Sequence, residues 1–129
     1  MAITHSTAAR NAATDAITAL IGASGRLRFR LTGTVSAPGT SVANLGLAAT
    51  AFGASATGTA TANAITSDTN AAGNATAVST FTLETSAGVV VIHGAVAASA
   101  SDINLTNGLV IAAADTVSCS SITYTALSA

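Results

Sequence analysis

Apolar side chains recur every three or four positions between Ser6 and Gly22, which is the period of an amphipathic helix. Ser6 or Thr7 can cap the start of this helix, and Gly22 can end it. The apolar stripe comprises Ala9, Ala13, Ala16, Ile17, Leu20 and Ile21. Because the stripe is mostly alanine, the helix can approach another surface closely, either on its own domain or on a neighbouring protein.

After Gly25 the period changes to two, the alternation of a β-strand. One face of this first strand carries Arg26, Arg28 and Arg30, and the opposite face carries Leu27, Phe29 and Leu31. The apolar face supplies large side chains to a core. The arginine face requires a separate explanation, because these three residues are most of the basic residues in the chain.

A second regular alternation predicts a hairpin that pairs Thr76–Glu84 with Val89–Ala97. Shorter strands are expected within 42–53, around Asn63–Thr66, before the Asn107-Gly108 turn and once or twice within 109–127, with a long exposed loop over Ser67–Asn74. The count is about seven or eight short strands after one helix. This pattern predicts a mainly β chain, an antiparallel β-sandwich or jelly-roll-like domain with one N-terminal α-helix.

The length of 129 residues predicts one domain, with a helical arm over 1–24 and the β-sandwich over 25–129. Half of the residues are hydrophobic, but most of these are alanine, and there are only three Phe, one Tyr and no Trp. Burying alanine stabilises a fold much less than the roughly 1.5–3 kcal/mol of a buried Leu, Val or Phe. The core is therefore expected to be thin, with burial completed by other protein subunits.

Charged residues make up only 7% of the chain, and the net charge is −1. This composition argues against a general nucleic-acid binder, which needs a larger basic patch. The longest apolar run, within 88–98, is too short to span a bilayer, so no membrane association is expected. The first residues lack the basic and apolar regions of a secretory signal, which predicts synthesis in the cytoplasm without export by the general secretory route.

No set of residues predicts catalysis, a cofactor or a metal. The acidic residues stand singly, at Asp15, Asp68, Glu84, Asp102 and Asp115. Cys119 lies in a strand-like setting typical of a small buried side chain, and nothing links it to His5 or His93 as a base. The oxygen-rich segment 67–74 has one carboxylate where calcium loops need several. The sequence therefore predicts a protein that is not an enzyme.

Three interpretations of the arginine row stay open. Arg26, Arg28 and Arg30 can form the solvated outer face of an amphipathic strand, guarding a sheet edge. They can instead meet an acidic surface on a protein partner, since the guanidinium fork binds carboxylates in a bidentate manner. Nucleic acid is the third interpretation, weakened by the lack of aromatic residues for stacking on bases.

Three stretches carry a resemblance that runs the length of the chain: "MAITHSTAARNAATDAITALIGASG", "GTATANAITSDTNAAGNATA" and "AADTVSCSSITYTAL". They resemble small structural proteins of tailed-bacteriophage virions, most closely head decoration (cement) proteins. Where that family usually has Gly-Asp before its last strand, this chain has Ala114-Asp115. The departure affects a turn.

The resemblance implies a structural protein on the capsid surface of the virion, made in the host cytoplasm. Its partners would be the major capsid protein and copies of itself, as a homotrimer, and it would stabilise the shell. The candidate interface residues are Arg26, Arg28, Arg30, Ala9, Ala13 and Ile17. The alternatives are a tail, neck or fibre-associated virion protein, and a host- or carbohydrate-binding module.

Overall fold

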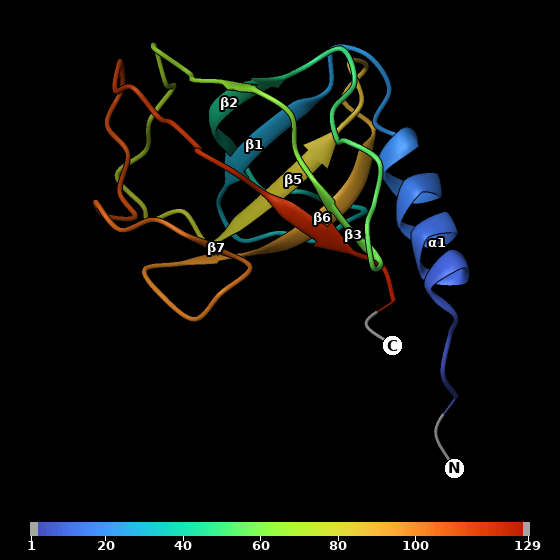
Figure 1. The fold of residues 1–129 in the computed structure, drawn as a ribbon. Helices are drawn as coiled ribbons and strands as arrows, with labels where there is room; N and C mark the ends of the chain where they lie inside the picture. The colour runs from blue at the N-terminus through green and yellow to red at the C-terminus, as the bar shows by residue number, and fades with distance from the viewer. Residues whose placement is uncertain (1–2, 128–129) are drawn as a thin grey trace.

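A computed structural model describes residues 3–127 and contains one helix followed by short strands (Figure 1). The elements are α1 Thr7–Ala19, β1 Arg26–Arg30, β2 Ser41–Leu47, β3 Thr59–Thr61, β4 Ile65–Thr66, β5 Thr80–Glu84, β6 Val90–Ala97, β7 Ile103–Asn104 and β8 Thr123–Thr125. The prediction of a mainly β, sandwich-like domain with one N-terminal helix is confirmed.

The strands form a curled six-stranded sheet in the order β4-β2-β1-β5-β6-β7 and a separate pair, β3-β8. Neighbouring strands of the large sheet are antiparallel, except that β6 and β7 run parallel. The sheet is therefore mixed, and the expectation of a purely antiparallel arrangement is wrong at this edge. In Figure 1 the β3-β8 pair crosses in front of the large sheet.

Both regularly alternating segments form strands in the structure. β1 covers Arg26–Arg30, and the hairpin pairs β5 with β6, although β5 begins at Thr80 instead of Thr76. The C-terminal stretch 109–127 contains one strand, β8, which agrees with the expected one or two, and 105–122 is irregular. Contrary to expectation, the 67–74 loop is not wholly exposed, since Ala71 is buried and Asp68 bridges to Val117.

The apolar core is centred on β1 and its two neighbours. Leu27 lies opposite Leu45 of β2 and Leu83 of β5, and all three are almost completely buried. On β6, Gly94 lies opposite Phe81, and a Cβ at Gly94 would fall 2.3 Å from the phenyl ring. The absence of a side chain at Gly94 thus lets the aromatic ring lie against the neighbouring strand.

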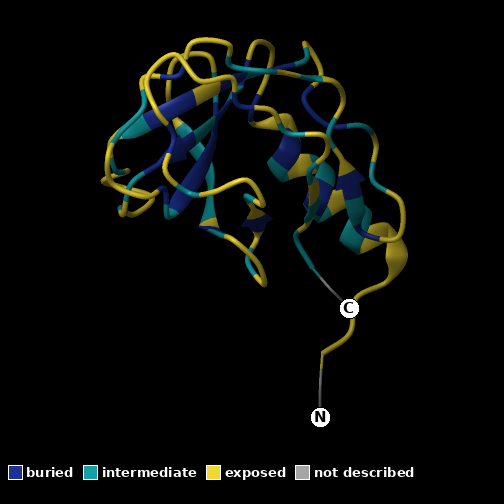
Figure 2. Cartoon of the chain, turned by 90° about the vertical axis from the view of Figure 1, so that its left-hand side faces the viewer, coloured by how far each residue is buried: buried dark blue, intermediate teal, exposed yellow. Residues whose placement is uncertain are grey.

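The helix begins as its sequence predicts, with the Ser6 hydroxyl accepting a hydrogen bond from the Ala9 amide at 3.2 Å. It ends at Ala19, and its C-cap is Leu20, two residues before the predicted cap Gly22. The segment that precedes the helix leads away from the body of the molecule and is exposed (Figure 2). The helix lies at one side of the domain, where it contacts β3 and β8 (Figure 1).

Candidate interaction surfaces

The helix is attached to the domain by its polar side. The Thr14 hydroxyl donates to the carbonyl of Gly58 at 2.6 Å and accepts from the amide of Ala126 at 3.1 Å. The Asn11 side-chain oxygen accepts from the amide of Gly58 at 2.7 Å. These bonds satisfy backbone groups on two segments that lie far apart in the sequence. Thr14 and Thr18 are the helix residues that become buried.

Two further contacts extend this polar seam toward the C-terminal end of the helix. The Asp15 carboxylate accepts from the amide of Ser55 at 2.9 Å, and the Ser55 hydroxyl donates to the carbonyl of Asn11 at 3.1 Å. Ile21, just after the helix, enters the apolar core. The helix is thus held by hydrogen bonds along its length and by one large apolar side chain at its end.

Most of the predicted alanine-rich stripe consequently lies away from the domain, whereas Ile21 at its end is buried in the core. Ala9, Ala16 and Leu20 are exposed, with Leu20 at 65%, while Ala13 and Ile17 are half-buried at the flank. Ahead of the helix, Ile3 is 85% exposed. The candidate residues Ala9, Ala13 and Ile17 therefore lie on the same side of the helix, with Ala9 exposed and the other two half-buried. We call Ala9, Ala13, Ala16, Ile17 and Leu20 the helix stripe.

The arginine row lies on a central strand, because β1 is flanked by β2 and β5. The interpretation that it guards a sheet edge is therefore wrong. Arg30 is only 8% exposed. Its guanidinium donates to the Glu84 carboxylate at 2.7 Å, to the carbonyl of Gly39 at 2.7 Å and to the Thr82 hydroxyl at 3.0 Å. The solvated interpretation is thus also wrong for Arg30.

Glu84 supplies an acidic partner from within the chain. Its side chain is 0% exposed, and Thr82 also donates a hydrogen bond to it. The Nε of Arg28 lies 3.7 Å from the second oxygen of the same carboxylate. Two guanidinium groups and a hydroxyl therefore lie around one buried carboxylate.

Arg26 is the exception in the row. It is half-buried and makes no hydrogen bond or ion pair with the residues that the structure describes. The arginines belong to β1, where Arg28 and Arg30 pair with Glu84 of β5 and Arg30 also bonds to a loop, whereas α1 contacts β3 and β8. The two groups of candidate residues therefore occupy different parts of the molecule, and of the arginines in this row only Arg26 has no ion pair within residues 3–127.

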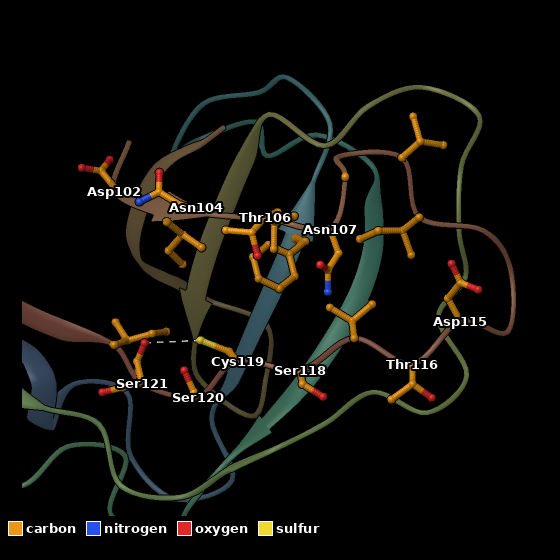
Figure 3. Close-up of a pocket in the computed structure, with 18 of the residues that line it drawn as sticks. Asp102, Asn104, Thr106, Asn107, Asp115, Thr116, Ser118, Cys119, Ser120 and Ser121 are labelled. Atoms are coloured by element: carbon orange, nitrogen blue, oxygen red, sulfur yellow. Dashed lines mark hydrogen bonds between the residues drawn. The ribbon is translucent and has the colours of Figure 1, made fainter. Parts of the chain in front are cut away.

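A hollow of about 550 Å³ lies beside the irregular C-terminal stretch (Figure 3). Thr106 and Asn107 lie on one side of it, and Ser118, Cys119 and Ser120 lie on the opposite side. Phe29 also lines it, but this ring is buried, so it offers no stacking surface. The volume falls within the roughly 300–1,000 Å³ of small-molecule sites. Sequence periodicity carries no signal for this cavity because its walls are irregular chain.

The polar groups that line the cavity are hydroxyls, amides and carboxylates, with no basic side chain among them. Asp102 and Asp115 each use one carboxylate oxygen to accept a backbone amide, from Ala95 at 2.9 Å and from Ala112 at 3.0 Å. These carboxylates therefore stabilise turns. The lining favours neutral or cationic polar groups over anions.

Cys119 lies in the cavity wall and not on a strand, so the strand-like interpretation of its setting is wrong. Its thiol is half-buried, packs against the core and donates to the carbonyl of Ser121 at 3.5 Å. Burial raises the pKa of the Cys119 thiol above its ordinary value, which lowers its reactivity at neutral pH.

Within residues 3–127, no three His, Cys, Asp or Glu side chains gather closely enough to hold a metal ion. The helix in this range falls short of the length and apolar character needed to cross a membrane. Compared with known proteins, the chain matches no family, no curated protein and no solved structure. The arguments about its function therefore start from the geometry of the helix stripe, the arginine row and the cavity.

Proposed function

We propose that this chain is a structural protein of a tailed-bacteriophage virion, attached to the outside of the capsid through the helix stripe, where it stabilises the shell. The observation that carries the proposal is the orientation of α1. Hydrogen bonds hold the polar side of the helix against the domain, so its apolar side faces outward. Ala9, Ala16 and Leu20 are exposed on that side, and exposed apolar side chains that lie together are typical of a protein–protein contact.

The major capsid protein is the partner that we propose for this surface. Alanine side chains along the stripe allow two backbones to approach closely, and Leu20 and Ile17 provide apolar area. A subunit that bridges neighbouring capsid proteins stabilises the assembled shell, because binding favours the state that holds both contacts. Repeated contacts over a shell add together, so modest affinity per copy is enough. A homotrimer would multiply the contacts of each bound unit in the same way.

Arg26 is the second contact in this proposal. Its guanidinium has no partner within the described chain, and it lies on the cationic face of β1. An acidic capsid surface is the complementary partner, since arginine pairs well with carboxylates. Arg28 and Arg30 support this contact indirectly by keeping the strand in place.

The direct test compares Ala9→Glu with Ala87→Glu on purified particles of the phage that encodes the chain. Ala9 belongs to the helix stripe, whereas Ala87 lies in the exposed turn between β5 and β6. We expect the Ala9→Glu protein to be lost from the purified particles and the Ala87→Glu protein to remain bound to them. Burial of an unpaired carboxylate at the contact costs several kcal/mol, and about 1.4 kcal/mol already lowers affinity tenfold.

Ala9→Glu also separates binding from folding. Ser6 is the N-cap, so position 9 is the third helical residue, where glutamate completes a capping box with Ser6. This variant should fold at least as stably as the wild type. Gel densitometry measures the amount of each variant on the particles. Equal amounts of the two variants would contradict attachment through the helix stripe. A wild-type copy number far below that of the capsid lattice would favour the neck, tail or fibre alternative.

A carbohydrate-binding module is a second candidate, supported by the cavity. Thr106, Asn107 and Ser120 line the hollow and make no side-chain hydrogen bond to residues 3–127. Such groups suit the hydroxyls of a neutral saccharide. A glycan array probed with the wild type and with Ser120→Val tests this candidate, with Ser86→Val in the exposed β5–β6 turn as the control. Binding that survives Ser120→Val, or no binding at all, would count against it.

A further inference from the structure

Asn107 and Gly108 form part of an exposed turn at the rim of the cavity. The backbone of Gly108 has a φ of 114°, and a Cβ placed there would meet nothing within 4 Å. The Asn107 carboxamide makes no hydrogen bond to the described residues, and the Gly108 amide makes none either. An unheld carboxamide therefore lies next to an uncrowded backbone nitrogen.

We propose that Asn107 is a site of spontaneous deamidation. The deprotonated backbone nitrogen of Gly108 attacks Cγ of Asn107 and forms a C–N bond. The bond from Cγ to the side-chain nitrogen breaks, and that nitrogen takes up protons and leaves as ammonia. Water then opens the cyclic imide at one of its two carbonyls, which leaves aspartate or isoaspartate at position 107. The sum is asparagine plus water giving an acid plus ammonia, with no oxidation or reduction.

The other asparagines are poorly placed for this reaction. Each is followed by a residue whose Cβ crowds the attacking nitrogen: Asn11, Asn44, Asn63, Asn70, Asn74 and Asn104. Four of them are also held by side-chain hydrogen bonds, namely Asn11, Asn63, Asn74 and Asn104. Deamidation should therefore be confined to position 107.

The reaction changes the chemistry of the cavity. Asp102 and Asp115 already line the hollow, and the product adds a third carboxylate to its wall. The isoaspartate product also lengthens the backbone by one carbon between positions 107 and 108. The chain beyond the turn stays anchored, because the carbonyls of Leu109 and Ile111 accept from the amides of Val78 and Asn74 at 2.9 and 2.8 Å. Fresh and aged protein thus differ in the charge and shape of the cavity rim.

The test is incubation of the folded full chain at mildly acidic and mildly alkaline pH, followed by brief digestion with a protease that cuts before aspartate. This protease releases residues 102–114, which contain both Asn104 and Asn107. We expect the mass gain of one deamidation on this peptide, rising with time and with pH. Fragmentation should locate the gain at position 107 and leave Asn104 unchanged. Aspartate at 107 creates a new cleavage site, whereas isoaspartate does not, so the two products are distinguished.

Asn107→Gln is the matched variant, because glutamine keeps a carboxamide but must close a larger and slower ring. Its 102–114 peptide should keep its mass under the same conditions. A gain shared equally between Asn104 and position 107 would overturn the proposal. Reaction of Asn107 in urea-unfolded protein but not in the folded chain would also overturn it, because the folded turn would then protect the side chain.

Discussion

At the residue scale, Glu84 determines what the arginine row does. A carboxylate that is completely removed from water is costly unless charges and hydrogen bonds compensate it. Arg30 and Thr82 both bond to one of its oxygens, and Arg28 faces the other. The row is therefore a structural element first, and within residues 3–127 only Arg26 of the row has no ion pair.

Arg30→Met tests this role. The substitution removes the closest countercharge and leaves Glu84 buried, so the free energy of unfolding should fall by about 3–5 kcal/mol. Urea denaturation measures the loss. Arg26→Met is the matched control and should change stability by no more than about 0.5 kcal/mol. Adding Glu84→Gln to Arg30→Met should restore part of the loss, because the amide carries no charge. Equal effects of the two single variants would contradict the structural role.

At the scale of the element, α1 is amphipathic with its polar side inward. The polar side chains of Asn11 and Thr14 can face the domain because they form hydrogen bonds with backbone groups there. A buried polar group contributes to stability when it is hydrogen-bonded, and its partners become costly when it is removed. The helix can therefore keep its apolar stripe outward and still remain attached to the domain.

Thr14→Val tests the polar seam. Valine has nearly the same shape but leaves the Gly58 carbonyl and the Ala126 amide without their partner. Unfolding should become easier by about 1–3 kcal/mol, read by thermal or urea denaturation. Thr7→Val, at the exposed start of the helix, is the control and should have little effect. An unchanged stability for Thr14→Val would mean that the hydrogen bonds of Asn11 and Asp15, together with Ile21, hold the helix without Thr14.

At the scale of the whole molecule, regular structure and burial are concentrated in one part of the chain. The core concentrates on β1, β2 and β5, whereas 105–122 is irregular and mostly exposed. Regions with few buried contacts open locally at lower free energy than the core does. The cavity and the Asn107-Gly108 turn both belong to this irregular part.

Hydrogen exchange of the free protein should show this division. Amides of β1 and β5, which pair on both sides within the sheet, should exchange slowest. Amides within 105–122 should exchange fastest, apart from those bonded to other segments, such as Leu105 and Val117. Residue-resolved exchange by NMR measures the difference. Equal protection of the amides in β1, β5 and 105–122 would contradict this division of the molecule.

Prediction from sequence succeeded where the signal is local. The alternation at 26–30, the β5–β6 hairpin and the Ser6 cap all depend on residues close together in the chain. It failed for the Glu84 cluster, because Arg30 and Glu84 lie 54 positions apart. The alternation placed each residue on a face of its strand but could not show that β1 and β5 are neighbours. The cavity was missed for a related reason, since its irregular walls have no period.

The sequence by itself determined the type of the main elements, because backbone periodicity and capping act between near neighbours. It also determined that charge is scarce and that large apolar residues are few. Only the tertiary structure decided which side of α1 faces outward, which arginine of the row stays free and which segments enclose the cavity. Those outcomes depend on the pairing of strands far apart in the sequence and on the satisfaction of buried polar groups by distant partners. The helix stripe faces outward because Thr14 and Asn11 find their partners in the 55–58 loop and near β8.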